Sequence, residues 1–97
     1  MTVAAVQTFS VVVEVLLRPG IADPQGATIE RALPALGMSG VRGVRAGKSF
    51  RFEVDAADEA AAHAQATLIA ERLLANPVIE EPTVTVTPSG VAAAEER

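Results

Sequence analysis

Alternating apolar and polar positions define the first regular element of the chain. From Phe9 to Leu17, β-branched and other apolar residues fall on every second position, which is typical of a strand. The opposite face of this strand is not purely polar, because Val12 and Leu16 lie on it. We therefore expect this face to be partly covered, for example by another subunit. The sequence Arg18-Pro19-Gly20 then predicts a turn.

A helix is predicted after this turn. Asp23 suits the N-cap, since its carboxylate can accept from free backbone N–H groups, and Pro24 suits the first helical position. The helix is expected to run to about Leu36, with Pro34 tightening its last turn and Gly37 as the C-cap. One side of this helix carries the apolar residues Ile29, Leu33 and Leu36.

The central segment, residues 41–55, returns to a strand pattern. Phe50, Phe52 and Val54 alternate with polar residues. Residues 41–46 are either a separate short strand that turns at Gly47, or the start of one long strand that bends there. The pattern leaves both arrangements open.

A second helix is expected from Asp55 or Ala56 to about Ala75. Asp58 follows Asp55 by three residues, a spacing similar to that of a capping box. Asn76-Pro77 should end this helix. Its apolar stripe is predicted to comprise Ala62, Ala66, Ile69 and Leu73.

A final strand is predicted to begin at Val78-Ile79 and to continue to Thr87. Pro82 lies inside it, which indicates an edge position or a bulge. The expected order is β-α-β(β)-α-β: an α+β, two-layer sandwich and ferredoxin-like relative, with two helices on one face of a small sheet. Its expected limits are a flexible extension at 1–8, one domain at 9–87 and a disordered tail at 88–97.

Composition narrows the possible functions. The chain has 97 residues, a net charge of −4, no cysteine and one histidine. A domain of this size buries only about 60% of its unfolded surface, so oligomerisation would usefully add burial. Acidic residues outnumber basic ones, 12 to 8, and no basic patch with interspersed aromatic residues is visible in the sequence. Both features argue against a nucleic-acid partner. Neither a signal peptide nor a membrane span is apparent, which favours a cytoplasmic protein.

Two sites of possible chemistry have simpler explanations. Residues 43–49 end in Gly-Lys-Ser, but Gly43 lies one residue too close to Gly47 for a phosphate-binding loop, and a strand pattern follows. His63 lies on a polar side of the second helix, four residues after Glu59, where a solvated histidine near a carboxylate is expected. We therefore expect no catalytic residue, cofactor-binding residue or metal ligand in this chain.

Three motifs carry a family resemblance. They are RPG with DPQG at 18–20 and 23–26, VRAGK at 44–48, and LLANPVIE at 73–80. Together, in this order and within a chain of this length, they resemble the PurS family, the small subunits of phosphoribosylformylglycinamidine synthase. The resemblance runs from about Val11 to Val86.

The resemblance implies a non-catalytic scaffold that forms dimers or tetramers. Its partners would be the PurL synthetase and the PurQ glutaminase. The complex converts formylglycinamide ribonucleotide (FGAR) into formylglycinamidine ribonucleotide (FGAM) in purine biosynthesis, with glutamine as the ammonia source. PurL would use ATP and Mg²⁺, and the small subunit would bridge PurQ and PurL so that ammonia reaches the synthetase.

Five charged residues in or beside these motifs are candidate partner contacts, with simple solvation as the alternative: Arg18, Arg45, Lys48, Glu80 and Glu81. Two other functions fit the element order. One is a regulatory βαββαβ domain that binds a small molecule at the loop containing Gly20. The other is a small dimeric enzyme working through His63.

Overall fold

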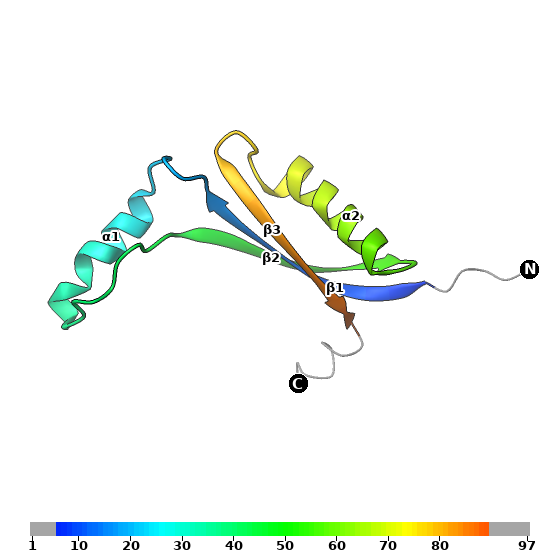
Figure 1. The fold of residues 1–97 in the computed structure, drawn as a ribbon, viewed down its shortest axis with the longest axis horizontal. Helices are drawn as coiled ribbons and strands as arrows, with labels where there is room; N and C mark the ends of the chain where they lie inside the picture. The colour runs from blue at the N-terminus through cyan, green and yellow to red at the C-terminus, as the bar shows by residue number, and fades with distance from the viewer. Residues whose placement is uncertain (1–5, 90–97) are drawn as a thin grey trace, which may run out of the picture.

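The computed structural model describes residues 6–89, which form one antiparallel sheet and two helices (Figure 1). The sheet has the order β2-β1-β3. Its strands are β1 (Gln7–Leu17), β2 (Gly47–Ala56) and β3 (Glu80–Pro88). The helices are α1 (Pro24–Ala32) and α2 (Glu59–Ile69). Short turns of other helical types follow them, η1 (Pro34–Leu36) after α1 and η2 (Ala70–Leu74) after α2. The predicted α+β, ferredoxin-like class is confirmed.

The core lies between α2 and one face of the sheet. The predicted alternation in β1 holds from Phe9 to Val15, because every second residue over that stretch is buried against the helix. Small side chains on α2 let the helix approach the sheet closely. The fully buried residues of this layer include Val11, Val13 and Val15 of β1 and Ala62, Ala66 and Ala70 of the helix and the turn after it. No helix among residues 6–89 is long and apolar enough to cross a membrane.

The second helix differs from its prediction at both ends. Its N-cap is Asp58, whose carboxylate accepts from the Ala61 N–H at 2.8 Å, and its first residue is Glu59 rather than Asp55 or Ala56. Asp55 instead remains in β2, where it accepts a 2.8 Å hydrogen bond from Thr8 of the neighbouring strand. Cross-strand pairing therefore extends the strand to Ala56 at the expense of the helix.

The apolar stripe of this helix was predicted correctly only in its first half. Leu73 is 79% exposed, whereas Leu74 is half-buried and Ala75 is buried. The reason is a change in helical period: the Ala75 N–H donates to the Ala70 carbonyl at 2.9 Å, five residues back, as in a π-turn. An α-helical spacing carried past Ala70 consequently selects the wrong residue.

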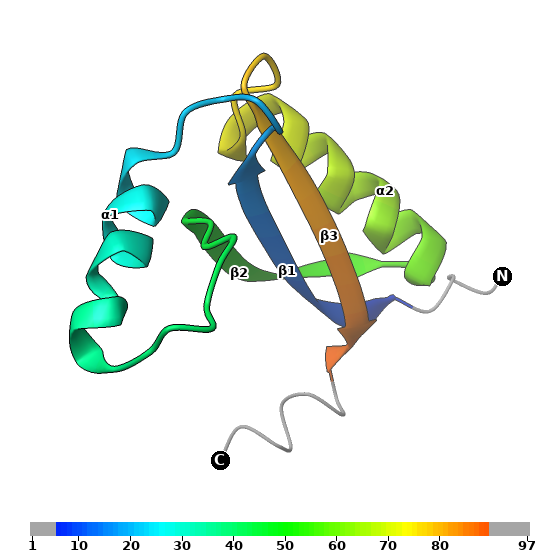
Figure 2. The same ribbon diagram turned by 60° about the vertical axis from the view of Figure 1, so that its left-hand side comes forward.

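The expectation that both helices cover one face of the sheet is wrong for α1. Figures 1 and 2 show α1 beyond the ends of the strands, while α2 alone lies over the sheet. The radius of gyration is 17.8 Å, against about 12 Å for a compact domain of this length. We call residues 23–37, which comprise α1, its N-cap and the turn after it, the α1 arm. Ile29 and Leu36 on this arm are 44% and 70% exposed, so its apolar side has no cover within residues 6–89.

The cap predictions for the first helix are confirmed. Asp23 accepts a 2.9 Å hydrogen bond from the Gly26 N–H, and Pro24 is the first helical residue. Pro34 starts a tighter 3₁₀ turn. Gly37 ends this turn in the left-handed region, with φ at 85°, which favours glycine.

Residues 38–46 contain no strand, so both predicted arrangements of 41–46 are wrong, and β2 begins only at Gly47. The backbone of this segment is held by side chains instead. The Val44 N–H donates to Glu30 Oε1 at 3.0 Å, and the Ala46 N–H donates to Asp23 Oδ2 at 2.9 Å. Carboxylates from the α1 arm thereby satisfy donors that a strand partner would otherwise take.

The last strand also begins later than predicted. Residues 76–79 form a turn, in which the Ile79 and Glu80 N–H groups donate to the Asn76 carbonyl at 3.1 and 2.7 Å. The edge position suggested by Pro82 is confirmed by the sheet order. β1 begins at Gln7, inside the predicted extension, and β3 includes Pro88. Residues 1–5 and 90–97 of the predicted extension and tail lie outside the described residues.

Candidate functional site

The five candidate contact residues lie at one end of the sheet. Arg18 follows the end of β1, Arg45 and Lys48 flank the start of β2, and Glu80 and Glu81 begin β3. The antiparallel register brings these points together, because Leu16 pairs with Gly47 and Leu17 pairs with Glu80. We call these five residues the sheet-end cluster. The three sequence motifs thus meet at one place in the fold.

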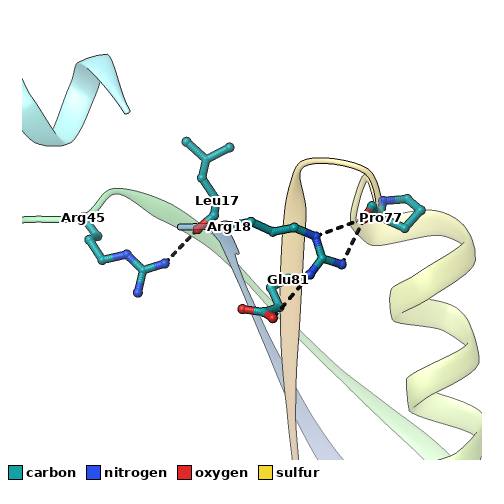
Figure 3. A network of polar contacts seen from close by, with 5 residues as sticks. All are labelled: Leu17, Arg18, Arg45, Pro77 and Glu81. Atoms are coloured by element: carbon teal, nitrogen blue, oxygen red, sulfur yellow. Dashed lines mark hydrogen bonds and ion pairs between the residues drawn. The ribbon is translucent and has the colours of Figure 1, made fainter. Parts of the chain in front are cut away.

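Arg18 fixes the turn before β3. Its Nε and Nη2 atoms donate to the Pro77 carbonyl at 3.1 and 3.0 Å, and its Nη1 lies 3.3 Å from Glu81 Oε2 (Figure 3). The side chains of Arg18 and Glu81 are 40% and 58% exposed. A surface ion pair of this kind adds little stability. Its main effect is to order two opposite charges on an accessible surface.

The other two cations are also held in place by contacts within the chain. Arg45 Nη2 donates to the Leu17 carbonyl at 2.7 Å (Figure 3). Lys48 Nζ lies 3.4 Å from Glu80 Oε2 and 6.0 Å from the centre of the Phe50 ring. The cluster is therefore not a set of freely solvated side chains. It is a partly ordered surface that carries both signs of charge.

Glu80 is the least exposed member of the two ion pairs, with 16% of its side chain accessible. Its Oε1 accepts a 2.7 Å hydrogen bond from the Asn76 N–H. This hydrogen bond, together with the contact to Lys48, lowers the pKa of Glu80 below its ordinary value, although partial desolvation opposes the shift. Glu80 therefore remains charged at neutral pH and holds Lys48 at the edge of the cluster.

Asp23 has a second role that the sequence did not reveal. Besides capping α1, it accepts from the Ala46 N–H, so one carboxylate joins the α1 arm to the segment before β2. The hydrogen bonds from Ala46 and Gly26, and the nearby charge of Arg45, lower the pKa of Asp23 below its ordinary value of 3.8, against a weaker opposing effect of desolvation. Asp23 thus sets where the arm leaves the sheet.

Replacing Asp23 with Asn should lower the melting temperature at neutral pH by a few degrees, since an amide presents only one acceptor oxygen to two N–H donors. The folded-state pKa of Asp23 is depressed, so its stabilising contribution is complete above the unfolded value of 3.8 and is lost as the pH falls through the folded pKa. Thermal unfolding of both proteins at about pH 7 and about pH 2.5 measures this difference. An Asp23→Asn deficit of equal size at both pH values would contradict the assignment.

A shallow hollow of about 350 Å³ lies beside the cluster, between the sheet end and the start of α1. Its charged groups Asp23, Lys48 and Glu80 already hold one another or backbone N–H groups, and Gln25 is its other polar side chain. The hollow therefore offers few unsatisfied groups to a small ligand. Within residues 6–89 there is no group of three or more histidine, cysteine, aspartate and glutamate side chains that could hold a metal ion.

The two other functions fit the structure less well. A βαββαβ regulatory domain needs four strands, whereas residues 6–89 form three. His63 is exposed on α2, as predicted, and its Nδ1 lies 3.4 Å from Thr67 Oγ1 rather than beside a carboxylate. The arrangement is better suited to contacts with other protein surfaces than to binding or chemistry within one chain.

Comparison with known proteins agrees with the sequence motifs. Residues 10–88 match the PurS family, described as phosphoribosylformylglycinamidine (FGAM) synthase. The PurS subunit of Mycobacterium leprae is 47% identical over 74 residues, which cover 76% of this chain and 90% of that subunit. The PurS subunit of Thermotoga maritima is 38% identical over 73 residues, covering 75% and 89%.

Solved structures show the same similarity in three dimensions. The crystal structure of the PurS subunit from Thermotoga maritima superposes with a TM-score of 0.78 at 35% identity, covering 86% of this chain and 95% of that one. A chain of the PurLQS structure from the same organism gives 0.75 at 36% identity, covering 82% and 98%. The chain therefore belongs to the PurS family, the PurS subunits of FGAM synthase.

Proposed function

We propose that this chain is the scaffold subunit that holds the PurQ glutaminase against the PurL synthetase in an FGAM synthase. The proposal rests mainly on the similarity of this chain to a chain in the PurLQS structure, of which 98% is covered. The activity of the complex is the ATP- and glutamine-dependent conversion of FGAR to FGAM. The proposal places the protein in the cytoplasm.

The role assigned to this chain is positional. Glutamine hydrolysis in such glutaminases uses a cysteine thiolate, and this sequence contains no cysteine. The Gly-Lys-Ser sequence at its centre leads into β2 and not into a helix, so it lacks the geometry of a phosphate-binding loop. ATP and Mg²⁺ would therefore be used by the synthetase. The scaffold would keep the distance between the two active sites short, so that ammonia is not lost to water.

The sheet-end cluster is the surface that we assign to contact with the larger subunits. Its charges are accessible and are held in defined positions by intrachain contacts, so little side-chain entropy is lost when a partner binds. Charges of both signs also favour one orientation of the partner over others. The proposal includes self-association of the chain, which would cover apolar surface that a domain of this size leaves exposed.

Light scattering tests the proposal through the masses of the assemblies. The chain is measured alone, and then with PurL and PurQ from the same organism in the presence of ATP, Mg²⁺ and glutamine. We expect a homodimer or larger species that enters a complex containing all three proteins. A chain that remains separate from both proteins, with glutamine-dependent turnover unaffected, would refute the scaffold role.

A further inference from the structure

The turn between α2 and β3 projects from one end of the sheet (Figures 1 and 2) and lies in the third sequence motif. The two most exposed large apolar side chains of residues 6–89 lie beside and within this turn, Leu73 at 79% and Val78 at 80%. Single exposed apolar residues are common, but two at one projecting corner indicate a contact surface. We call Leu73 and Val78 the apolar knob.

The backbone holds Leu73 on the outside of the molecule. The turn η2 is a π-turn and adds one residue to the helical period, so Leu74 packs against the core while Leu73 remains exposed. An α-helical continuation would instead direct Leu73 towards the sheet, as the spacing of the stripe predicted. π-turns are rare, and they occur frequently at functional sites. The exposure of Leu73 is therefore a property of the fold.

The turn that carries Val78 is already ordered by hydrogen bonds. The Val78 N–H donates to Asn76 Oδ1 at 3.0 Å, and the Asn76 N–H donates to Glu80 Oε1 at 2.7 Å. Arg18 donates twice to the Pro77 carbonyl, at 3.1 and 3.0 Å (Figure 3). Binding through a turn that is fixed in this way costs little backbone entropy. Val78 is thus presented to a partner in a defined position.

We infer that the apolar knob anchors this chain to a larger subunit of the complex, which receives it in a concave apolar pocket bordered by charged residues. The inference rests on the proposed function and names the part of the surface that supplies most of the affinity. Arg18 joins the knob to the sheet-end cluster, because it holds Pro77 and pairs with Glu81. Two side chains bury too little area to hold a complex alone. The cluster would supply the polar rim that surrounds an apolar centre in such interfaces.

A second copy of this chain is a less suitable occupant. A twofold contact joins the same patch on both subunits, so that patch must be complementary to itself. A projecting knob requires a hollow instead. Two hollows on this chain are lined partly by charged side chains, Asp23 and Lys48 in one and Glu30 and Arg31 in the other, and so suit an apolar side chain poorly.

Replacing Val78 with Asp tests the anchor. This substitution should weaken binding of the larger subunit about thirtyfold or more, because a carboxylate would be buried in an apolar pocket. Leu73→Gln should weaken it in the same direction, about fivefold or more. Val6→Asp is the matched control: Val6 is 65% exposed and precedes β1, at the opposite end of the sheet, so this variant should bind as the wild type does.

Biolayer interferometry measures the affinity of each full-length chain for PurL, for PurQ and for both together, with ATP, Mg²⁺ and glutamine present. The partner whose affinity falls with Val78→Asp is the one that carries the pocket. Light scattering of each variant alone should give the wild-type mass, and circular dichroism should give the wild-type melting temperature, since both knob residues are exposed.

Four results would contradict these inferences in different ways. Wild-type affinity of Val78→Asp and Leu73→Gln for every partner would overturn the anchor but leave the scaffold role standing. An equal loss with Val6→Asp would overturn it as well, because added negative charge alone would then explain the loss. A changed mass of Val78→Asp alone would assign the knob to a second copy. Failure of the wild type to bind either larger subunit would refute the scaffold role itself.

Discussion

An FGAM synthase reconstituted without this chain is expected to lose about 90% or more of its glutamine-dependent activity, since ammonia released in solution is diluted instead of delivered at high local concentration. Ammonia-dependent synthesis should persist in part, because the synthetase then takes its substrate directly from solution. Both rates are measured on the same preparation, with glutamine or an ammonium salt as nitrogen donor.

A variant chain provides the control for this experiment. Adding back His63→Ala should restore glutamine-dependent turnover as fully as the wild-type chain does, since His63 is exposed and, within residues 6–89, its side chain hydrogen-bonds only to Thr67. Equal loss of the glutamine- and ammonia-dependent activities on omission would count against a bridging role. Failure of His63→Ala alone to restore activity would instead favour a catalytic role for this chain.

Replacing Ala66 with Asp should destabilise the fold severely. Ala66 is fully buried between α2 and the sheet. A carboxylate there would lose its hydration without gaining a partner, at a cost of about 4 kcal/mol or more. Small domains have only about 5–15 kcal/mol of total stability, so much of the protein should unfold. Circular dichroism during thermal unfolding measures the change.

Ala64→Asp is the matched control, because Ala64 lies on the exposed side of the same helix. Both substitutions carry the same small penalty in helix propensity, about 0.5 kcal/mol. The difference in melting temperature between the two variants therefore reports burial alone. Equal melting temperatures would contradict the packing of α2 on the sheet.

The strands and caps of this fold are local properties, and the sequence predicted them well. Period-two alternation identified β1 and most of β2, and Asp23, Pro34 and Gly37 acted as predicted around the first helix. The predictions that were wrong concern features that depend on contacts between residues far apart in the sequence. Residues 41–46 showed a strand-like pattern, yet their donors bind carboxylates of the α1 arm. No local pattern indicates that choice.

Two further features could not be predicted for similar reasons. The π-turn after Ala70 shifts the buried positions and leaves Leu73 exposed. The position of α1 beyond the strands depends on the route of the chain and not on the amphipathic pattern of the helix (Figure 1).

The candidate site was only partly visible in the sequence. The motifs supplied its residues, but their convergence at one sheet end follows from the register of β1 with both neighbours. Arg18 and Arg45 both donate to backbone carbonyls, which carry no sequence signal. The hydrogen bond from the Ala46 N–H to Asp23 could not be predicted from the sequence. The sequence indicated only an N-cap, whose carboxylate has a second oxygen that can accept another hydrogen bond.

The most direct test of the scaffold role follows the nitrogen atom itself. The complete complex is given glutamine labelled with ¹⁵N in its amide, together with an excess of unlabelled ammonium, and the label in FGAM is measured by mass spectrometry. If the chain holds the two active sites together, the product should keep most of the ¹⁵N, and omitting the chain should dilute it towards the bulk ammonium. The same dilution with and without the chain would contradict the account.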